Sequence, residues 1–322
     1  MLLRIPIGLL EANGDPHTSV LHRSEESAAA EHVGHNKMKL GVFSALYLVH
    51  LLSSIQMSHQ EVVLDMMPDT FDDQYIGCAD KMEAAMPKIL EEEMNDDQFA
   101  AMWNISGQEW NRTRFNVSKD FKDEYGIALL LYTMESPYLI YKQLNGNISI
   151  AGQSRDYYMD HFHLKALHFY LTRALQVLRR GCGNLTQVYR GTRIGSVNVT
   201  NEMRFDGFVS SYSSMGKAAG FGLQPYFFIS TCYGVDISEL LLNGESEFLI
   251  PIGETFTKVS QSGTAYKVES TGKLCSFYNC AYFKDKKRSR PVCNSARGGS
   301  LEIQQLLTRL TVTLALLLIS FL

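Results

Sequence analysis

The sequence predicts an α+β protein, with a helical N-terminal half packed on a core of mixed or antiparallel β-sheet. From about residue 59 to residue 180, apolar residues recur every three or four positions, which is typical of helices. After Gly183 the chain changes to short β-branched or aromatic segments separated by glycines, which is typical of strands. Helices followed by strands indicate an α+β fold rather than the alternating pattern of an α/β fold.

Three stretches of the first half are predicted to be helical. Residues 78–95 carry apolar side chains at helical spacing, and Pro87 within them predicts a break or a kink. Residues 123–135 predict a second helix. Residues 155–180 predict the strongest one, because a broad apolar stripe runs along them and Gly181 follows directly.

The second half is predicted to supply the strands of the sheet. Its segments are short, rich in β-branched and aromatic residues, and bounded by glycines or other turn residues. They are residues 185–194, 203–214, 225–235, 246–263, 265–272 and 275–283.

The N-terminus predicts a leader over residues 1–58. Residues 1–37 are polar and lack periodicity, which indicates disorder. Residues 38–58 begin with a lysine, continue with a short apolar stretch and end with small and polar residues, as a signal peptide does. Translation from Met38 is one explanation of its internal position, and a signal anchor with a short cytoplasmic tail is the alternative.

The C-terminus predicts a glycosylphosphatidylinositol (GPI) attachment signal over residues 294–322. Small residues and a polar spacer precede an apolar run from about Leu310 to the end of the sequence. That run is too short to span a bilayer as a helix, which needs about 20 residues. A small site, a spacer and a terminal apolar tail form the signature of a removed anchor signal.

The cysteines and glycosylation sequons agree with passage through the secretory pathway. No two cysteines form a C-x-x-C pair, so disulfides are expected rather than zinc or thiol redox chemistry. The six cysteines are Cys78, Cys182, Cys232, Cys275, Cys280 and Cys293. Six Asn-x-Ser/Thr sequons begin at Asn104, Asn111, Asn116, Asn147, Asn184 and Asn198.

Two classes of partner are not expected. The formal net charge of -4 gives no basic surface for a polyanion, so nucleic acid is not an expected partner. His161, His163 and His168 lie in one predicted helix, but His161 and His163 fall on different faces and no acid completes the usual metal-binding spacing. No metal site is therefore predicted.

Three polar positions at predicted strand ends are candidates for a binding site. Arg190 ends one strand, where a guanidinium can clamp a phosphate and Gly191 lets a ligand approach the backbone. Ser210 ends another strand. Glu245 and Glu247 stand two residues apart at the start of a third, which places both carboxylates on the same face of a strand. Each alone is also consistent with an ordinary solvated strand edge.

The order of these residues resembles a family signature. Arginine, serine and Glu-x-Glu on successive strands are similar to the pattern of the arginine-specific mono-ADP-ribosyltransferases of vertebrate cell surfaces. The resemblance covers about residues 60–283 and includes further segments of the chain. They are "LDMMPDTFDDQYIGC" (64–78), "YYMDHFHLKALHFYLTRALQVL" (157–178), "VYRGT" (188–192), "ESEFLIPIGETF" (245–256) and "YNCAY" (278–282).

The resemblance implies a role for each site residue. Arg190 is expected to hold the phosphates of NAD and the nearby ribose, and Ser210 to orient the catalytic glutamate. Glu247 is expected to be the catalytic acid, and Glu245 to go with arginine as the acceptor. Phe221 falls where the family has an aromatic ring beside the nicotinamide. Two departures, the aliphatic stretch "VDISELLLNG" and Tyr212 within the serine cluster, bear on which acceptor fits.

This division of roles is chemically reasonable. Breaking the N-glycosidic bond of NAD creates an oxocarbenium-like ribose, which a carboxylate stabilises as in glycosidases. An arginine acceptor with a pKa above about 12 is a poor nucleophile until its proton is accepted. A second carboxylate on the same face can pair with the incoming guanidinium and take that proton.

The resemblance also implies a pairing of cysteines. The two disulfides of the family correspond to Cys78 with Cys280, and to Cys182 with Cys232. Cys275 and Cys293 have no counterpart in the family, and they are expected to pair with each other.

The expected protein is an NAD-dependent protein-arginine ADP-ribosyltransferase with the fold of that family. Residues 59–293 form the catalytic domain, on the extracellular face of the plasma membrane and anchored by GPI. NAD is its co-substrate, and its partners are arginine-bearing extracellular proteins. An NAD glycohydrolase and a catalytically silent surface binding protein on the same scaffold are the alternatives.

Overall fold

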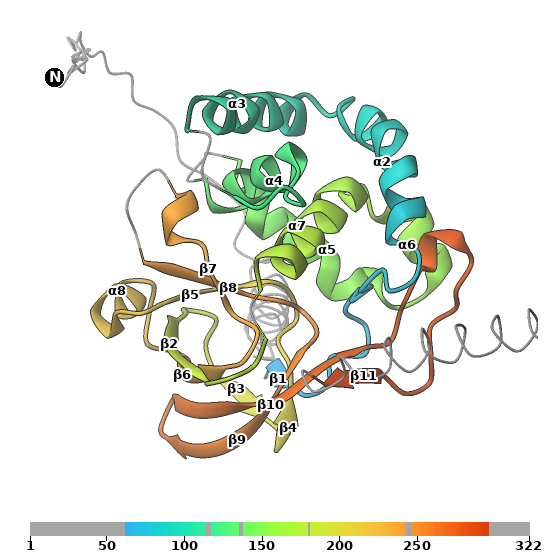
Figure 1. Ribbon diagram of the computed structural model, residues 1–322. Helices are drawn as coiled ribbons and strands as arrows, with labels where there is room; N and C mark the ends of the chain where they lie inside the picture. Colours follow the sequence, from blue (N-terminus) through green and yellow to red (C-terminus); the bar gives the residue numbers. More distant parts are fainter. Residues whose placement is uncertain (1–61, 114–116, 135–137, 180, 242–245, 296–322) are drawn as a thin grey trace, which may run out of the picture. The chain divides into compact units, whose positions relative to one another are not determined.

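The computed structural model describes residues 62–113, 117–134, 138–179, 181–241 and 246–295 (Figure 1). The predicted leader, and the predicted anchor signal beyond Ser295, lie outside these residues. So does Glu245. Among the described residues, no helix is both long and apolar enough to cross a membrane.

Helices dominate the first part of the described chain and gather on one side of it (Figure 1). They are α2 (Ala79–Glu93), α3 (Asp97–Thr113), α4 (Asp123–Thr133), α5 (Ile140–Ala151), α6 (Arg155–His161) and α7 (Lys165–Leu178). Two of the predicted helices correspond to α2 and α4. Pro87 lies inside α2 without ending it.

The prediction of a single helix over residues 155–180 is wrong, because the chain forms α6 and α7 with a break between them. Both carboxylate oxygens of Glu93, at the end of α2, accept from the backbone N–H of Ala166 at 3.1 and 3.2 Å. The Lys165 ammonium donates to the carbonyls of Met159 and Phe162. These groups satisfy the free backbone ends at the break, so α7 starts anew at Lys165.

The second part forms a nine-stranded sheet and one short helix. The strands are β2 (Thr186–Gly191), β4 (Glu202–Met203), β5 (Val209–Tyr212), β6 (Tyr226–Thr231), β7 (Val235–Asp236), β8 (Glu247–Ile250), β9 (Glu254–Ser262), β10 (Ala265–Ser276) and β11 (Val292–Ser295). Their order is β4-β9-β10-β6-β2-β5-β8-β7, with β11 beside β10. The pairing of β10 with β6 is parallel and the other pairs of this sheet are antiparallel. The predicted α+β class is confirmed.

Other elements differ from the prediction in detail. Residues 281–283 form a 3₁₀ helix, η2 (Ala281–Phe283), instead of continuing a strand. Two short strands that were not predicted, β1 (Val62–Leu64) and β3 (Val197–Val199), pair in parallel. A short helix, α8 (Met215–Gly220), follows β5, and a 3₁₀ turn, η1 (Ser238–Leu240), follows β7.

Two large apolar clusters, beside a small third one around Ala218, hold these elements together. The first fills the helical half and includes Phe208 and Leu249 from the sheet half. The second lies within the sheet and includes Val209 and Ile250. Neighbouring residues at the start of β5 and within β8 therefore belong to different clusters, and these strands lie where the two halves meet.

Three disulfides cross-link the described part of the chain. They are Cys78–Cys280, Cys182–Cys232 and Cys275–Cys293. The first joins the start of α2 to η2, across 202 residues of sequence. The third joins β10 to β11, so the sheet extends to Ser295, two residues beyond the predicted end of the domain.

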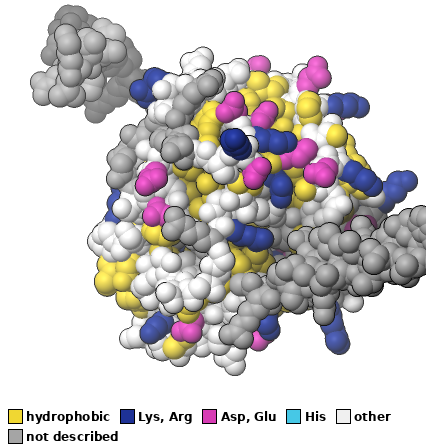
Figure 2. All heavy atoms as spheres, viewed as in Figure 1, with side chains coloured by type: hydrophobic (Ala, Val, Ile, Leu, Met, Phe, Trp, Pro, Cys, Tyr) yellow, Lys and Arg dark blue, Asp and Glu magenta, His cyan; other side chains and the backbone are white. Residues whose placement is uncertain are grey.

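The surface carries charges of both signs. On the face shown in Figure 2, acidic and basic side chains of the described residues are interspersed over the helices. This pattern agrees with the small net charge of -4.

Candidate active site

Arg190 extends from β2, which lies between β6 and β5 in the sheet. Its Nη1 donates to the carbonyl oxygen of Ser210 at 2.7 Å, so the guanidinium reaches across to β5. Among the described residues, Nε and Nη2 have no hydrogen-bond partner. A half-buried guanidinium that keeps donors available suits a phosphate group.

The two serines of β5 have different surroundings. The Ser211 side chain is fully buried and donates to the carbonyl of Phe248 on β8 at 3.1 Å. Ser210 is half-buried. Ser211 therefore serves the strand pairing, while the Ser210 hydroxyl is the one that can serve a ligand.

Glu247 is the first residue of β8 and is only 5% exposed. The antiparallel register of β5 and β8 sets it directly opposite Tyr212. Its position is therefore fixed by strand pairing. Glu245, the other predicted acid, lies outside the described residues, so the expected same-face arrangement of the two carboxylates stays a prediction.

The buried Tyr132 hydroxyl is influenced by charges on two strands of the sheet. Burial raises the pKa of Tyr132, on α4, to about 12. The Arg190 charge and a hydrogen bond from Asn145 act in the opposite direction, and the Glu247 carboxylate acts to raise the pKa further. In the sheet, β5, which carries Ser210, lies between β2 with Arg190 and β8 with Glu247.

Phe221 lies beside this cluster. It follows α8 directly, is 44% exposed and stacks on the ring of Tyr212, with centroids 5.0 Å apart and planes 7° apart. The Lys217 ammonium lies 5.9 Å from both ring centroids. Since Tyr212 is the register partner of Glu247, the aromatic pair stands next to the predicted catalytic acid.

Gly191 also has a packing role that was not expected. A Cβ built on it would lie 2.2 Å from the carbonyl oxygens of both Ala218 and Gly222. The space beside its Cα is therefore occupied by the backbone at the end of α8. Gly191 allows α8, and with it Phe221, to pack closely on β2.

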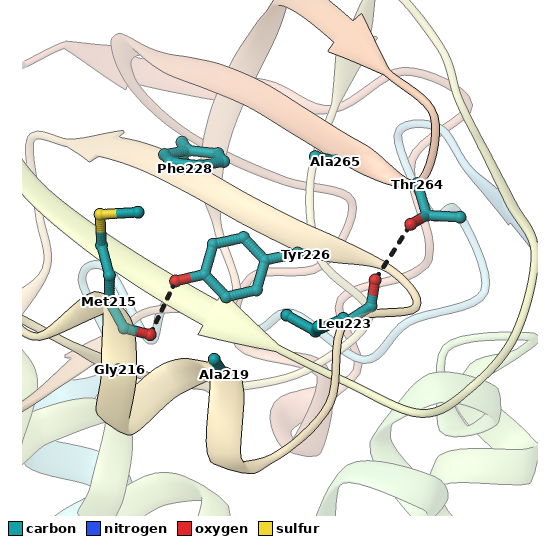
Figure 3. Close-up of a pocket in the computed structure, with 8 residues that line it drawn as sticks. All are labelled: Met215, Gly216, Ala219, Leu223, Tyr226, Phe228, Thr264 and Ala265. Carbon is teal, nitrogen blue, oxygen red and sulfur yellow. Dashed lines mark hydrogen bonds between the residues drawn. The ribbon is translucent and has the colours of Figure 1, made fainter.

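A hollow of about 460 Å³ lies between α8, β6 and the turn before β10. Figure 3 shows Tyr226 reaching from β6 toward α8, where its hydroxyl donates to the Met215 carbonyl at 3.1 Å. On the other side of the hollow, the Thr264 hydroxyl donates to the Leu223 carbonyl at 3.0 Å. The lining side chains are uncharged, and none is a predicted site residue.

No metal site is found among the residues that the structure describes, because no three His, Cys, Asp or Glu side chains group closely enough. His161 and His163 are exposed. His168 is fully buried beside the Tyr75 hydroxyl at 2.7 Å, and burial lowers its pKa to about 3. His168 is a neutral core residue.

Sequence patterns did not predict Tyr132, or Asn145, whose Nδ2 donates to the Tyr132 hydroxyl. Tyr132 follows three leucines in α4, where it resembles an ordinary core residue. Asn145 lies in the sequence "LNGN", which suggests a turn or a glycosylated loop. Both are part of the site only because α4 and α5 pack near β5.

Comparison with known proteins identifies the family of this chain. A family model described as NAD:arginine ADP-ribosyltransferase matches residues 64–275. The erythroblast NAD(P)(+)--arginine ADP-ribosyltransferase of Gallus gallus is 39% identical over 249 residues, which cover 74% of this chain and 82% of that protein. The GPI-linked NAD(P)(+)--arginine ADP-ribosyltransferase 1 of Homo sapiens is 35% identical over 292 residues, covering 82% of this chain and 88% of the relative.

Solved structures show the same fold. The crystal structure of the eukaryotic mono-ADP-ribosyltransferase ART2.2 superposes with a TM-score of 0.62 at 34% identity, covering 69% of this chain and 99% of that one. A variant of ART2.2 solved in complex with NAD gives a TM-score of 0.60 at 33% identity, with the same two coverages of 69% and 99%. This chain therefore belongs to the NAD:arginine ADP-ribosyltransferase family, among the vertebrate ecto-ADP-ribosyltransferases.

Proposed function

We propose that this protein transfers a single ADP-ribose from NAD to arginine side chains of extracellular proteins and releases nicotinamide. One observation carries the proposal. Arg190 contacts β5 at the Ser210 carbonyl, and Glu247 lies on β8, the strand on the other side of β5. A cation for the phosphates, a hydroxyl and a nearly buried carboxylate are the groups that the reaction requires.

Each group has a distinct task in this scheme. Arg190 binds the pyrophosphate through the donors that it keeps available. Glu247 stabilises the positive charge that develops on the ribose as the bond from C1′ to the nicotinamide nitrogen breaks. Because β8 fixes its position, Glu247 can do so with little reorganisation. Ser210 orients this carboxylate and the ribose, and Phe221 lies where the nicotinamide ring leaves.

The acceptor step is assigned to Glu245. A guanidinium nitrogen of the acceptor attacks C1′, and Glu245 accepts the proton that this nitrogen loses. A carboxylate also pairs with an arginine through two parallel hydrogen bonds, which orients the acceptor. This assignment distinguishes arginine transfer from simple hydrolysis of NAD, in which water takes the place of the acceptor.

The proposed location is the outer face of the plasma membrane, with a GPI anchor. The described residues contain no free cysteine, in keeping with an oxidising compartment. The names of the relatives, an ecto-ADP-ribosyltransferase of Bos taurus and a GPI-linked enzyme of Homo sapiens, support the same location. Release of the protein from intact cells by phosphatidylinositol-specific phospholipase C tests the anchor.

The activity is tested with the full chain expressed on cultured cells and given labelled NAD with a soluble arginine analogue. The wild type is expected to release nicotinamide and to form labelled conjugate. Glu247→Gln is expected to lose both reactions, whereas Glu245→Gln loses the conjugate and keeps the release of nicotinamide. Glu269→Gln, the same isosteric change at an exposed position of β10, serves as the control and keeps both.

The alternatives predict different results. Free ADP-ribose without any conjugate would identify a glycohydrolase. A protein that neither consumes NAD nor is stabilised by it against heat would be a silent binding protein, since a ligand of the folded state raises the melting temperature. Equal loss of both reactions in the two glutamate variants would refute the assignment of Glu245 to the acceptor.

A further inference from the structure

Two side chains of the helical half hold the backbone of the chain just before β5. Asn145, on α5, accepts from the Phe208 N–H through Oδ1 at 3.1 Å and donates to the Phe208 carbonyl through Nδ2 at 3.0 Å. Its amide therefore pairs with both backbone groups of Phe208, as a neighbouring strand would. Tyr132, on α4, donates to the same carbonyl at 2.9 Å. We call this pair of side chains the helix clamp.

The helix clamp is internally connected. Nδ2 of Asn145 also donates to the Tyr132 hydroxyl, at 3.1 Å, so the two side chains orient each other. Gly207 makes room for them, because a Cβ at this position would lie 2.6 Å from Oδ1 of Asn145. The clamp thus depends on a particular glycine as well as on its own two side chains.

The clamp acts where the chain passes between the two cores. Phe208 is buried in the helical cluster, whereas Val209, the next residue, is buried in the sheet cluster. Strand pairing alone begins only at Val209. The bonds from Asn145 and Tyr132 therefore fix the start of β5 relative to the helices, which the sheet itself cannot do.

The clamped backbone leads directly to the proposed site. Ser210 follows Phe208 by two residues, and Arg190 donates to the Ser210 carbonyl at 2.7 Å. A shift at Phe208 is therefore passed to the Ser210 hydroxyl and to the guanidinium that rests on this backbone. Glu247 is reached less directly, because its register partner on β5 is Tyr212, four residues after Phe208. A change of the clamp would therefore displace Ser210 and Arg190 more than Glu247.

We propose that Asn145 and Tyr132 are positioning residues, which set Ser210 and Arg190 against Glu247 through the backbone of Phe208 without contacting the substrate. This inference rests on the proposed function of the site. A misplacement of about 1 Å between groups of an active site costs about 100-fold in rate. Loss of the clamp should therefore reduce turnover far more than it reduces stability.

The test uses two conservative variants in the full chain. Asn145→Asp keeps the shape of the side chain but replaces the Nδ2 donor with an acceptor. Tyr132→Phe removes only the hydroxyl. The expected result for each is a fall of about 10- to 100-fold in kcat/KM for nicotinamide release, with a melting temperature close to that of the wild type.

Matched controls separate positioning from a structural role. Asn279 makes the same two-point pairing with the backbone of Ile76, with both hydrogen bonds at 2.7 Å, in a segment away from the site. Tyr233 likewise donates to a backbone carbonyl, that of Gly272, at 2.9 Å. Asn279→Asp and Tyr233→Phe are expected to keep the kcat/KM of the wild type, whatever their effect on stability.

The two clamp residues should also act as one unit. The Asn145→Asp, Tyr132→Phe double variant is expected to lose no more activity than the more damaged single variant, because one displacement underlies both losses. Unchanged turnover in both single variants, or losses that merely follow the melting temperature in clamp and control variants alike, would overturn the inference and leave the proposed function intact.

Failure of the proposed function itself gives a different result. In that case the wild type releases no nicotinamide, and the clamp is judged from the rise in melting temperature that NAD produces. The wild type and Asn279→Asp are expected to show this rise, and the clamp variants to lose most of it because Arg190 is displaced. An equal rise in all of them would refute the positioning role.

Discussion

Removal of the Arg204 guanidinium is expected to destabilise the fold strongly. Arg204 is fully buried and binds four acceptors. Nε donates to the Met66 carbonyl at 2.6 Å and Nη2 to the Met67 carbonyl at 2.8 Å. Nη1 donates to the Asp72 carboxylate at 2.6 Å and to the Cys275 carbonyl at 3.2 Å. This side chain thus joins the segment after β1 to the end of β10.

The magnitude follows from the groups that are left behind. Arg204→Met leaves the Asp72 carboxylate, itself fully buried, without its cation. Breaking a buried ion pair in this way costs about 3–5 kcal/mol. For a domain of this size, 1 kcal/mol corresponds to roughly 2–4 °C in melting temperature, so the expected fall is roughly 6–20 °C.

The assay is denaturation by heat and by urea with the disulfides intact. Arg112→Met is the control, because Arg112 pairs with Glu109 on the surface, where its side chain is 67% exposed. Such a pair contributes about 0–1 kcal/mol. The double variant Arg204→Met, Asp72→Asn should recover part of the loss, because it leaves no buried charge alone. A loss for Arg204→Met no larger than that of the control would refute the reasoning.

Three further predictions concern packing, pH and a disulfide. Gly191→Ala places a Cβ 2.2 Å from two carbonyl oxygens at the end of α8. This variant should lower the free energy of unfolding by about 1–3 kcal/mol and reduce nicotinamide release. An unchanged melting temperature would contradict this prediction. Burial raises the pKa of Glu93 from 4.5 to about 8, so the folded state holds this proton more tightly than the unfolded state does. Stability should therefore fall as the pH rises from 4.5 to 8, and melting curves of Glu93→Gln should show a gain over the wild type that grows across this window. Replacing Cys275 and Cys293 with serine opens a loop of 18 residues and should lower the free energy of unfolding, measured with urea, by about 3 kcal/mol. A loss below about 1 kcal/mol would show that this disulfide constrains the unfolded chain little.

Local patterns predicted the elements whose signals lie within one stretch of sequence. α2 has buried residues at positions 82, 86, 89 and 93, a spacing that the sequence displays directly. The break between α6 and α7 has no such signal. It depends on Glu93, which reaches Ala166 from 73 positions earlier in the chain. A long-range cap of this kind is invisible to any reading of periodicity.

The residues of the candidate site likewise divide into those suggested by local sequence patterns and those that depend on contacts with distant parts of the chain. Arg190, Ser210 and Glu247 could be proposed because their order along the chain resembles a family signature, although Ser210 lies inside β5 and not at its end as expected. Tyr132 and Asn145 could not, because their importance comes from bonds to a backbone 76 and 63 residues away. The packing of Gly191 against the end of α8 could not be predicted for a related reason, since the contact joins segments about 30 residues apart.

Strand pairing fixes the position of Glu247, and this bears on the catalytic role proposed for it. Glu247 is the first residue of β8 and stands opposite Tyr212, while the next carbonyl, that of Phe248, accepts from Ser211. A group that must stabilise a short-lived charge is most effective when it is already in place. The position of Glu247, fixed by its pairing with β5, therefore supports the proposal that it is the catalytic acid.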